Sequence, residues 1–215
     1  MKKLQKIKLL EGQLICTTGL HIGAGDTGMH IGGTDNPVIK KMGTLSEPYI
    51  PGSSLKGKIR SLLEHYKGSE WDTDLAILFG KKATDNLNSE LDVGTSRLSF
   101  WDCFLTNEWK NFAQDQDIPF TEVKMENTIN RQDGKAQNPR NTERVIAGSV
   151  FDFKLSIKEF ENDNNYETLI LTGLKLLELD NLGGSGSRGY GKVKFKNLSI
   201  DGVSIQEKLD TIKLF

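Results

Sequence analysis

The 215-residue sequence predicts an α+β fold, and three observations lead to that prediction. Four stretches alternate apolar and polar residues as half-buried strands do, at residues 6–23, 96–105, 144–160 and 192–200. Two others repeat apolar residues at helical spacing, at residues 51–68 and 166–180. Polar stretches without periodicity separate them. We therefore expect one domain, residues 1–215, with large insertions at roughly 24–50 and 106–143.

The first strand contains several strand formers, Ile7, Leu9, Ile15 and Leu20 among them. The first helix is the clearest element, and its expected buried face is Leu55, Ile59, Leu62, Leu63 and Tyr66. Ser53 or Ser54 is placed to cap this helix, and Lys56 and Arg60 share another face of it. A basic patch is therefore expected near its N-terminal half.

The second helix has Ile170, Leu174 and Leu177 at three- and four-residue steps. A short helical piece is also expected at residues 72–79. In chain order the main elements are strand, helix, strand, strand, helix and strand. This β-α-β-β-α-β order is that of the ferredoxin-like fold.

Composition excludes some classes of protein. No apolar run approaches the roughly 18 residues that a membrane-spanning helix needs, so a cytoplasmic protein without membrane contact is expected. Cys16 and Cys103 are interpreted as buried free thiols, and the three histidines form no metal-binding pair. The formal net charge of −1 does not indicate nucleic-acid binding, but residues 51–68 and 183–196 are locally basic.

The segment GGSGSRGYGKVKF, residues 183–195, matches two known motifs. Residues 184–189 read GxGxxG, but a dinucleotide site needs a strand before the motif and a helix after it, and here the order is reversed. Residues 188–195 match an RNA-recognition signature except at Lys192, on the wrong strand of the fold. A plain turn needs one or two glycines. Five, interleaved with serine and with Arg188 among them, favour phosphate binding by backbone N–H groups. Tyr190 to Phe195 are expected mainly to close the sheet.

Three stretches together resemble one family: TGLHIGAGDTGMHIGGTDNPVIK (18–40), YIPGSSLKGKIRSLLE (49–64) and LDNLGGSGSRGYGKVKF (179–195). The chain resembles the RAMP superfamily of CRISPR proteins, and in particular the repeated backbone subunit of the type III-A (Csm) effector complex. The resemblance implies a modified RNA-recognition fold with a thumb-like hairpin. It also implies four kinds of partner: a crRNA guide, a complementary target RNA, other copies of the chain and other subunits of the Csm complex.

The same resemblance implies an endoribonuclease that cuts target RNA and depends on Mg²⁺ or another divalent cation. Asp35 matches the catalytic aspartate and is the candidate metal ligand; without the resemblance, Asp-Asn-Pro is simply a good turn sequence. His21 is expected either to contact RNA or move a proton, or to be a structural histidine. Asp102 is expected to orient a neighbour rather than to catalyse.

The residues implied to contact guide RNA lie in two segments, Ser53, Ser54, Lys56 and Arg60 at the helix start and Gly184, Ser185, Gly186, Ser187 and Arg188 in the glycine segment. An ordinary solvated helix face is the alternative for Lys56 and Arg60. The thumb maps onto roughly residues 120–143. There Arg131 and Arg140 are candidates for phosphate contacts and Met125 or Ile129 for wedging between bases, with a solvated loop as the alternative.

The function implied is a guide-RNA-binding subunit that stacks along the crRNA and cleaves target RNA at regular intervals. Two alternatives stay open. One is a structural filament subunit of the same complex that does not cleave. The other is a guide-processing endoribonuclease of the same superfamily, although such enzymes usually have two tandem ferredoxin-like halves and a histidine-based mechanism.

Overall fold

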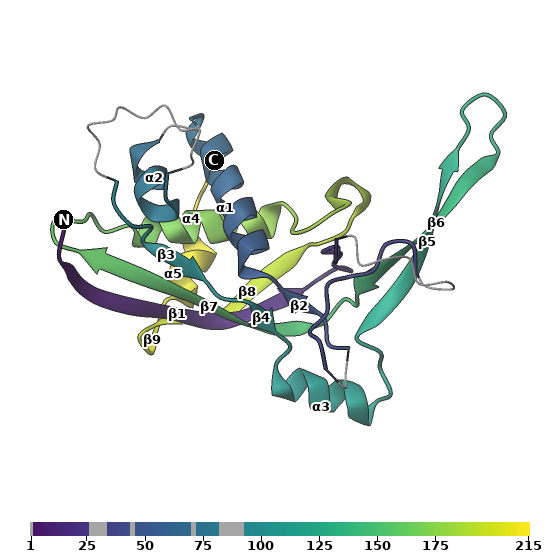
Figure 1. Ribbon diagram of the computed structural model, residues 1–215, viewed down its shortest axis with the longest axis horizontal. Helices are drawn as coiled ribbons and strands as arrows, with labels where there is room; N and C mark the ends of the chain where they lie inside the picture. The colour runs from purple at the N-terminus through teal and green to yellow at the C-terminus, as the bar shows by residue number, and fades with distance from the viewer. Residues whose placement is uncertain (1, 26–33, 44–45, 70–71, 82–92) are drawn as a thin grey trace.

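The computed structural model describes residues 2–25, 34–43, 46–69, 72–81 and 93–215. Within these residues, five antiparallel strands form the main sheet in the order β3-β7-β1-β8-β9 (Figure 1). They are β1 (Leu4–Cys16), β3 (Leu98–Phe100), β7 (Val150–Phe160), β8 (Val193–Ile200) and β9 (Val203–Ser204).

The remaining described elements surround this sheet. Two short sheets pair β2 (Tyr49–Ile50) with β4 (Cys103–Phe104) and β5 (Thr121–Ile129) with β6 (Ala136–Val145). The helices are α1 (Gly52–Lys67), α2 (Thr73–Phe79), α3 (Asn107–Asp115), α4 (Glu167–Leu179), α5 (Gln206–Thr211) and the 3₁₀ turn η1 (Gly186–Arg188). In the described part of the chain, none of the helices combines the length and the apolar character that crossing a bilayer requires.

The predicted α+β class and β-α-β-β-α-β order are confirmed, with β1, β3, β7 and β8 as the four strands. β7 separates β1 from β3, and β1 separates β7 from β8, so the connections through α1 and α4 each skip one strand. The two halves of the fold therefore interlock, and α1 and α4 pack together above the sheet (Figure 1).

The core lies between these helices and the sheet. Alternate residues of β7 are buried, and Phe153 meets Phe195 of β8 edge to face with ring centroids 4.9 Å apart. Gly173 allows α4 to approach α1, because a Cβ there would lie 2.7 Å from Cγ2 of Ile59. Cys16 and Cys103 are buried free thiols, and burial raises the pKa of each to about 12.

Several predicted bounds were wrong. β1 ends at Cys16 rather than at residue 23, and the second predicted strand breaks at residues 101–102 into β3 and β4. The third begins at Val150, because Arg144 and Val145 end β6 instead. The helix α3 lies in a stretch that was expected to be a loop; Trp109, Phe112 and Ala113 stand at helical spacing in it, but only Ala113 is buried.

The N-terminus of α1 is capped from another part of the chain. Its first residue, Gly52, follows Pro51 and donates its backbone N–H to a carboxylate oxygen of Asp102 at 2.8 Å. The expectation that Ser53 or Ser54 caps the helix is therefore wrong, and both serines lie inside the first turn. The expectation that Asp102 orients a neighbour is confirmed, since its negative charge sits at the positive end of the helix.

We expect Asp102→Ala to lower the free energy of unfolding by about 1 kcal/mol, because the helix loses both a hydrogen-bond acceptor and a favourable charge. Urea unfolding followed by circular dichroism measures the change. Asp152→Ala is the matched control, because Asp152 is exposed on β7 and is expected to change stability little. Equal stability of the two variants would contradict the capping role.

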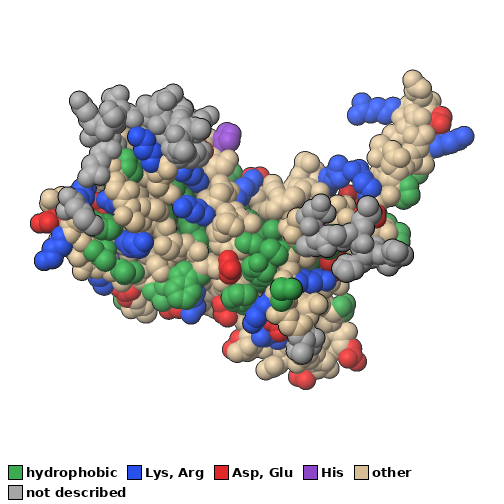
Figure 2. Space-filling view, viewed as in Figure 1, with side chains coloured by type: hydrophobic (Ala, Val, Ile, Leu, Met, Phe, Trp, Pro, Cys, Tyr) green, Lys and Arg blue, Asp and Glu red, His purple; other side chains and the backbone are tan. Residues whose placement is uncertain are grey.

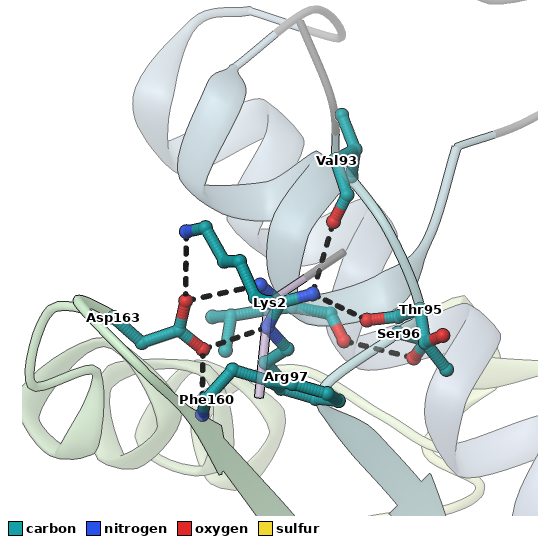
Figure 3. Close-up of polar contacts among 8 residues, drawn as sticks. Lys2, Val93, Thr95, Ser96, Arg97, Phe160 and Asp163 are labelled. Atoms are coloured by element: carbon teal, nitrogen blue, oxygen red, sulfur yellow. Dashed lines mark hydrogen bonds and ion pairs between the residues drawn. The ribbon is translucent and has the colours of Figure 1, made fainter. Parts of the chain in front are cut away.

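A buried arginine, Arg97, joins three distant parts of the chain (Figure 3). Its guanidinium is 2% exposed and meets the carboxylate of Asp163 through two hydrogen bonds, of 2.8 and 3.0 Å. It also donates to the carbonyls of Val93 and Thr95, which lie before β3. Lys2 donates to Asp163 from the N-terminal segment. This network fixes the entrance to β3 against the turn between β7 and α4.

Candidate nucleic-acid interface

The β5–β6 hairpin confirms the predicted thumb-like insertion. It projects from the body of the protein (Figure 1), with Lys and Arg side chains along it (Figure 2). Arg131 lies exposed at its turn, Arg140 lies exposed on β6, and Met125 and Ile129 on β5 are 77% and 57% exposed. The proposed phosphate and wedge contacts of these residues stay predictions.

The segment that carries Asp35 docks against β6. Asn36 bridges to Thr142, and its backbone carbonyl accepts a hydrogen bond from the N–H of Glu143 at 3.0 Å. The Asp35 carboxylate accepts from the backbone N–H of Asn141 at 3.2 Å through Oδ2, and the residue is exposed. Within the described residues its Oδ1 makes no hydrogen bond. Asp35 is therefore held in place while one of its oxygens faces solvent.

Glu143 of β6 holds the segment that carries Asp35 against the hairpin. Its side chain is buried, and its carboxylate accepts hydrogen bonds from the backbone of Val38 (3.0 Å), from Lys40 Nζ (2.6 Å) and from Thr121 Oγ1 (2.8 Å). Burial alone would raise the pKa of Glu143, but these hydrogen bonds outweigh it and hold the pKa below its usual value. The charged carboxylate thus pins residues 38–40 to the base of the hairpin. Sequence reasoning missed Glu143.

His21 docks beside Asp35. Its Nδ1 lies 2.7 Å from the backbone oxygen of Glu143, and because a carbonyl only accepts, Nδ1 carries the hydrogen. Asp35 contacts Asn141 and His21 contacts Glu143, two positions apart, so the two contact points lie about 7 Å apart along β6. The structure thus brings the two candidate residues to one strand. It orients the His21 ring and leaves its role in RNA binding or proton transfer a prediction.

The glycine segment packs tightly against His21, which lies five residues after the end of β1. Gly184 donates its N–H to the carbonyl of His21 at 2.9 Å. Gly183 has φ +74°, and a Cβ there would lie 2.2 Å from that carbonyl oxygen; a Cβ at Gly191, with φ +71°, would lie 1.9 Å from the carbonyl oxygen of Leu182. Packing therefore accounts for part of the glycine content. Phosphate binding by the remaining backbone N–H groups stays a prediction.

Tyr190 has a different place from the one expected. Instead of closing the sheet, it lies fully buried beneath the hairpin, and β8 begins three residues later. Its hydroxyl donates to Glu126 Oε1 at 3.1 Å, and its ring is flanked by Lys124 Nζ and the Arg144 guanidinium, 4.5 and 5.0 Å from the centroid. Arg188 pairs with the other oxygen of Glu126 at 3.1 Å. The glycine segment and the hairpin are thus joined.

The cations of α1 do not form the shared face that was predicted. Arg60 is 9% exposed, and its guanidinium binds the Glu64 carboxylate at 2.7 Å and the Gly80 carbonyl at 2.9 Å, so it supports the contact between α1 and α2. A direct role for Arg60 in holding phosphates does not fit this burial. Lys56 makes no hydrogen bond or ion pair within the described residues. Lys58 pairs at 2.6 Å with Asp180, just before the glycine segment.

No group of three His, Cys, Asp or Glu side chains in the described part of the chain could hold a metal ion. Metal binding by Asp35 stays a prediction.

Comparison with known proteins identifies the family. The model of the RAMP superfamily matches residues 13–194. The CRISPR system Cms endoribonuclease Csm3 of Streptococcus thermophilus is 46% identical over 205 residues, covering 90% of this chain and 88% of that protein. The protein of the same name from Mycobacterium tuberculosis is 42% identical, and the match covers 94% of this chain and 94% of that protein. The one from Methanothermobacter thermautotrophicus is 39% identical, and the match covers 92% of this chain and 87% of that protein.

Two solved structures share the fold. The Csm3–Csm4 subcomplex of the type III-A CRISPR-Cas interference complex contains a chain that is 28% identical, with a TM-score of 0.57 and coverage of 99% of this chain and 98% of its own. The type III-B Cmr-beta complex bound to cognate target RNA contains a chain that is 16% identical, with a TM-score of 0.62 and coverage of 91% and 61%. This chain belongs to the RAMP superfamily, as its three motif stretches indicated.

Proposed function

We propose that this chain is a backbone subunit of a type III-A CRISPR interference complex, which binds the crRNA guide and cuts complementary target RNA. The observation that carries the proposal is the exposed Asp35 carboxylate, held against β6 at the base of the hairpin. Support comes from relatives, 39–46% identical over about nine tenths of this chain, that are named Csm3 endoribonucleases.

The guide contacts that we propose lie around the glycine segment and the start of α1. Within residues 184–188, the backbone N–H groups of Ser185, Gly186 and Ser187 and the Arg188 guanidinium would contact the guide phosphates, since the N–H groups of Gly184 and Arg188 already donate to carbonyls of the protein. Ser53, exposed in the first turn of α1, and Lys56, whose ammonium has no partner among the described residues, would add contacts from the helix. Arg60 is left out, because its guanidinium is already bound inside the protein.

In the proposed cleavage the 2′-oxygen of the target attacks the adjacent phosphorus, a 2′,3′-cyclic phosphate forms, and the 5′-oxygen leaves and takes a proton from water. Asp35 would accept the 2′-hydroxyl proton, and His21 contacts β6 two residues farther along. We also propose a requirement for a divalent cation. Mg²⁺ accepts one carboxylate together with substrate phosphates, so it would be held jointly by Asp35 and the target RNA.

The proposed partners are the guide, the target, further copies of this chain stacked along the guide, and other Csm subunits. The Csm3–Csm4 subcomplex shows that a protein of related sequence and fold assembles with another subunit of a type III-A complex. Stacked copies would place one Asp35 at each repeat of the filament, which would give cuts at a fixed interval.

The proposal is tested by adding end-labelled complementary RNA to the assembled complex, with and without Mg²⁺. We expect fragments at a regular spacing with Mg²⁺, and none after chelation with EDTA. Bound but intact target in Mg²⁺ would indicate the non-cleaving filament subunit instead. Cuts in the guide precursor alone would indicate a guide-processing enzyme. A non-complementary RNA is the control and should stay intact.

A further inference from the structure

We propose that the Glu126 carboxylate stands in for an RNA phosphate in the RNA-free chain, and that RNA binding exchanges it for a phosphate on Arg188. The inference rests on the proposed function, and it assigns a regulatory role to a residue of the hairpin. It concerns the junction where β5 meets the glycine segment. There an open concavity is lined by Glu126, Asn127, Thr128, Arg140 and Arg188.

The two partners in this ion pair are held very differently. The Arg188 side chain is 52% exposed, and its ion pair with Glu126 at 3.1 Å is the contact that an incoming phosphate would replace. The Glu126 side chain is only 16% exposed. It also accepts from the Tyr190 hydroxyl at 3.1 Å and pairs with Lys124 Nζ at 3.3 Å. Glu126 therefore stays satisfied after Arg188 leaves.

Glu126 is also charged when the exchange takes place. Burial opposes its ionisation, but the hydrogen bonds from Lys124, Tyr190 and Arg188 outweigh burial and hold the pKa of Glu126 below its usual value. A carboxylate and a phosphodiester are both anions that a guanidinium binds, and here Nη1 of Arg188 meets a single oxygen of Glu126, Oε2, at 3.1 Å. The occupied Arg188 thus resembles its RNA-bound state, and the cost of the exchange is small.

The exchange costs little free energy, because an exposed ion pair contributes little to stability. Tyr190 is fully buried, with its ring between Lys124 and Arg144, so the hairpin stays attached to the glycine segment when Arg188 swings to the RNA. The junction therefore has a fixed part, built on Tyr190, and an exchangeable part, built on Arg188. The Glu126 carboxylate therefore lowers the affinity for RNA, because a phosphate has to displace it from the Arg188 guanidinium.

The test is a double-mutant cycle on the full-length chain with a fluorescein-labelled, unstructured single-stranded RNA as the probe. Glu126→Gln keeps an acceptor for the Tyr190 hydroxyl and removes the charge. We expect it to bind the probe about two- to fivefold more tightly than wild type, the range that an exposed ion pair implies.

Two further variants separate the exchange from simple charge repulsion. In an Arg188→Gln background, Glu126→Gln should give no gain in affinity, because there is no guanidinium to release. The matched control is Asp133→Asn, which removes the same charge from the same hairpin, where the Asp133 carboxylate accepts from the backbone N–H of Lys135 at 3.1 Å and pairs with no cation among the described residues. It should bind the probe no more than wild type. Thermal unfolding checks that all variants are folded.

Each result either supports or overturns the exchange of Glu126 for a phosphate. Unchanged affinity in Glu126→Gln, or an equal gain in the Arg188→Gln background, would overturn the exchange while leaving the proposed RNA binding in place. A gain of the same size in Asp133→Asn would assign the effect to net charge and would also overturn it. If neither wild type nor any variant bound the probe, both the proposed function and this inference would fail.

Discussion

Target RNA bound by a complex that carries Asp35→Ala should remain uncut. The Asp35 side chain offers an exposed carboxylate docked against β6, and losing a general base or cation ligand typically slows a reaction by about 10²–10⁴-fold. Assembly and target affinity should stay unchanged, because Asp35 contributes a single hydrogen bond, to the Asn141 backbone, to the docking of its segment. Single-turnover cleavage of end-labelled target and a filter-binding assay measure the two properties separately.

Asp35→Asn is the sharper variant. Its amide oxygen can still accept from the Asn141 N–H, so the segment should stay docked while the charge is lost. We expect cleavage to fall as far as in Asp35→Ala, with unchanged thermal stability. Cleavage at the wild-type rate by either variant, in an assembled complex, would remove Asp35 from the active site and leave His21 as the nearest alternative.

The largest effect on stability is expected at Arg97. In Arg97→Met the buried Asp163 carboxylate loses both guanidinium hydrogen bonds, and breaking a buried ion pair in this way costs about 3–5 kcal/mol. Urea unfolding measures the loss. Lys8→Met is the control, since Lys8 pairs with Glu159 at the surface and should lose at most about 1 kcal/mol.

Two further measurements identify the ion pair as the cause. The double variant Arg97→Met/Asp163→Asn should recover part of the loss, because the remaining buried group is neutral. The Arg97 guanidinium also holds the pKa of Asp163 at about 2, against an ordinary 3.8. The resulting stability, about 2 kcal/mol, is complete above pH 4 and lost as the pH falls toward 2. Asp163→Asn should lack this loss. An Arg97→Met variant as stable as the Lys8→Met control would refute the argument.

The sequence predicted the elements whose apolar residues repeat at strand or helix spacing. The alternation in β7 and the spacing of Leu55, Ile59 and Leu63 in α1 reflect burial by one layer, so both elements and the topology were correct. The helix α3 was missed, because its apolar face is short and consists of Trp109, Phe112 and Ala113 amid polar residues. Arg60 was misplaced because helical spacing puts it near Lys56 as well as Glu64, and spacing alone does not say which contact forms.

The site was only partly predictable for a related reason. The resemblance located Asp35, His21 and the glycine segment, each within a short stretch. Glu143 and Glu126 act on residues far along the chain: Glu143 contacts Val38, 105 positions away, and Glu126 contacts Tyr190, 64 positions away. One sequence alone does not show which residues far apart along the chain contact each other. Tyr190 was therefore assigned to the sheet, although it lies under the hairpin.

The docking on β6 also divides the hairpin into two parts that differ in their tendency to associate. Near its base β6 is paired on both sides, with β5 on one edge and with Leu20 and Asn36 on the other. Toward the tip, among the described residues, the same strand pairs with β5 alone. Unpaired strand edges invite strands from other chains. On β6, the edge that is open to strand addition is thus residues 136–140, and the segment that carries Asp35 shields the rest of this edge.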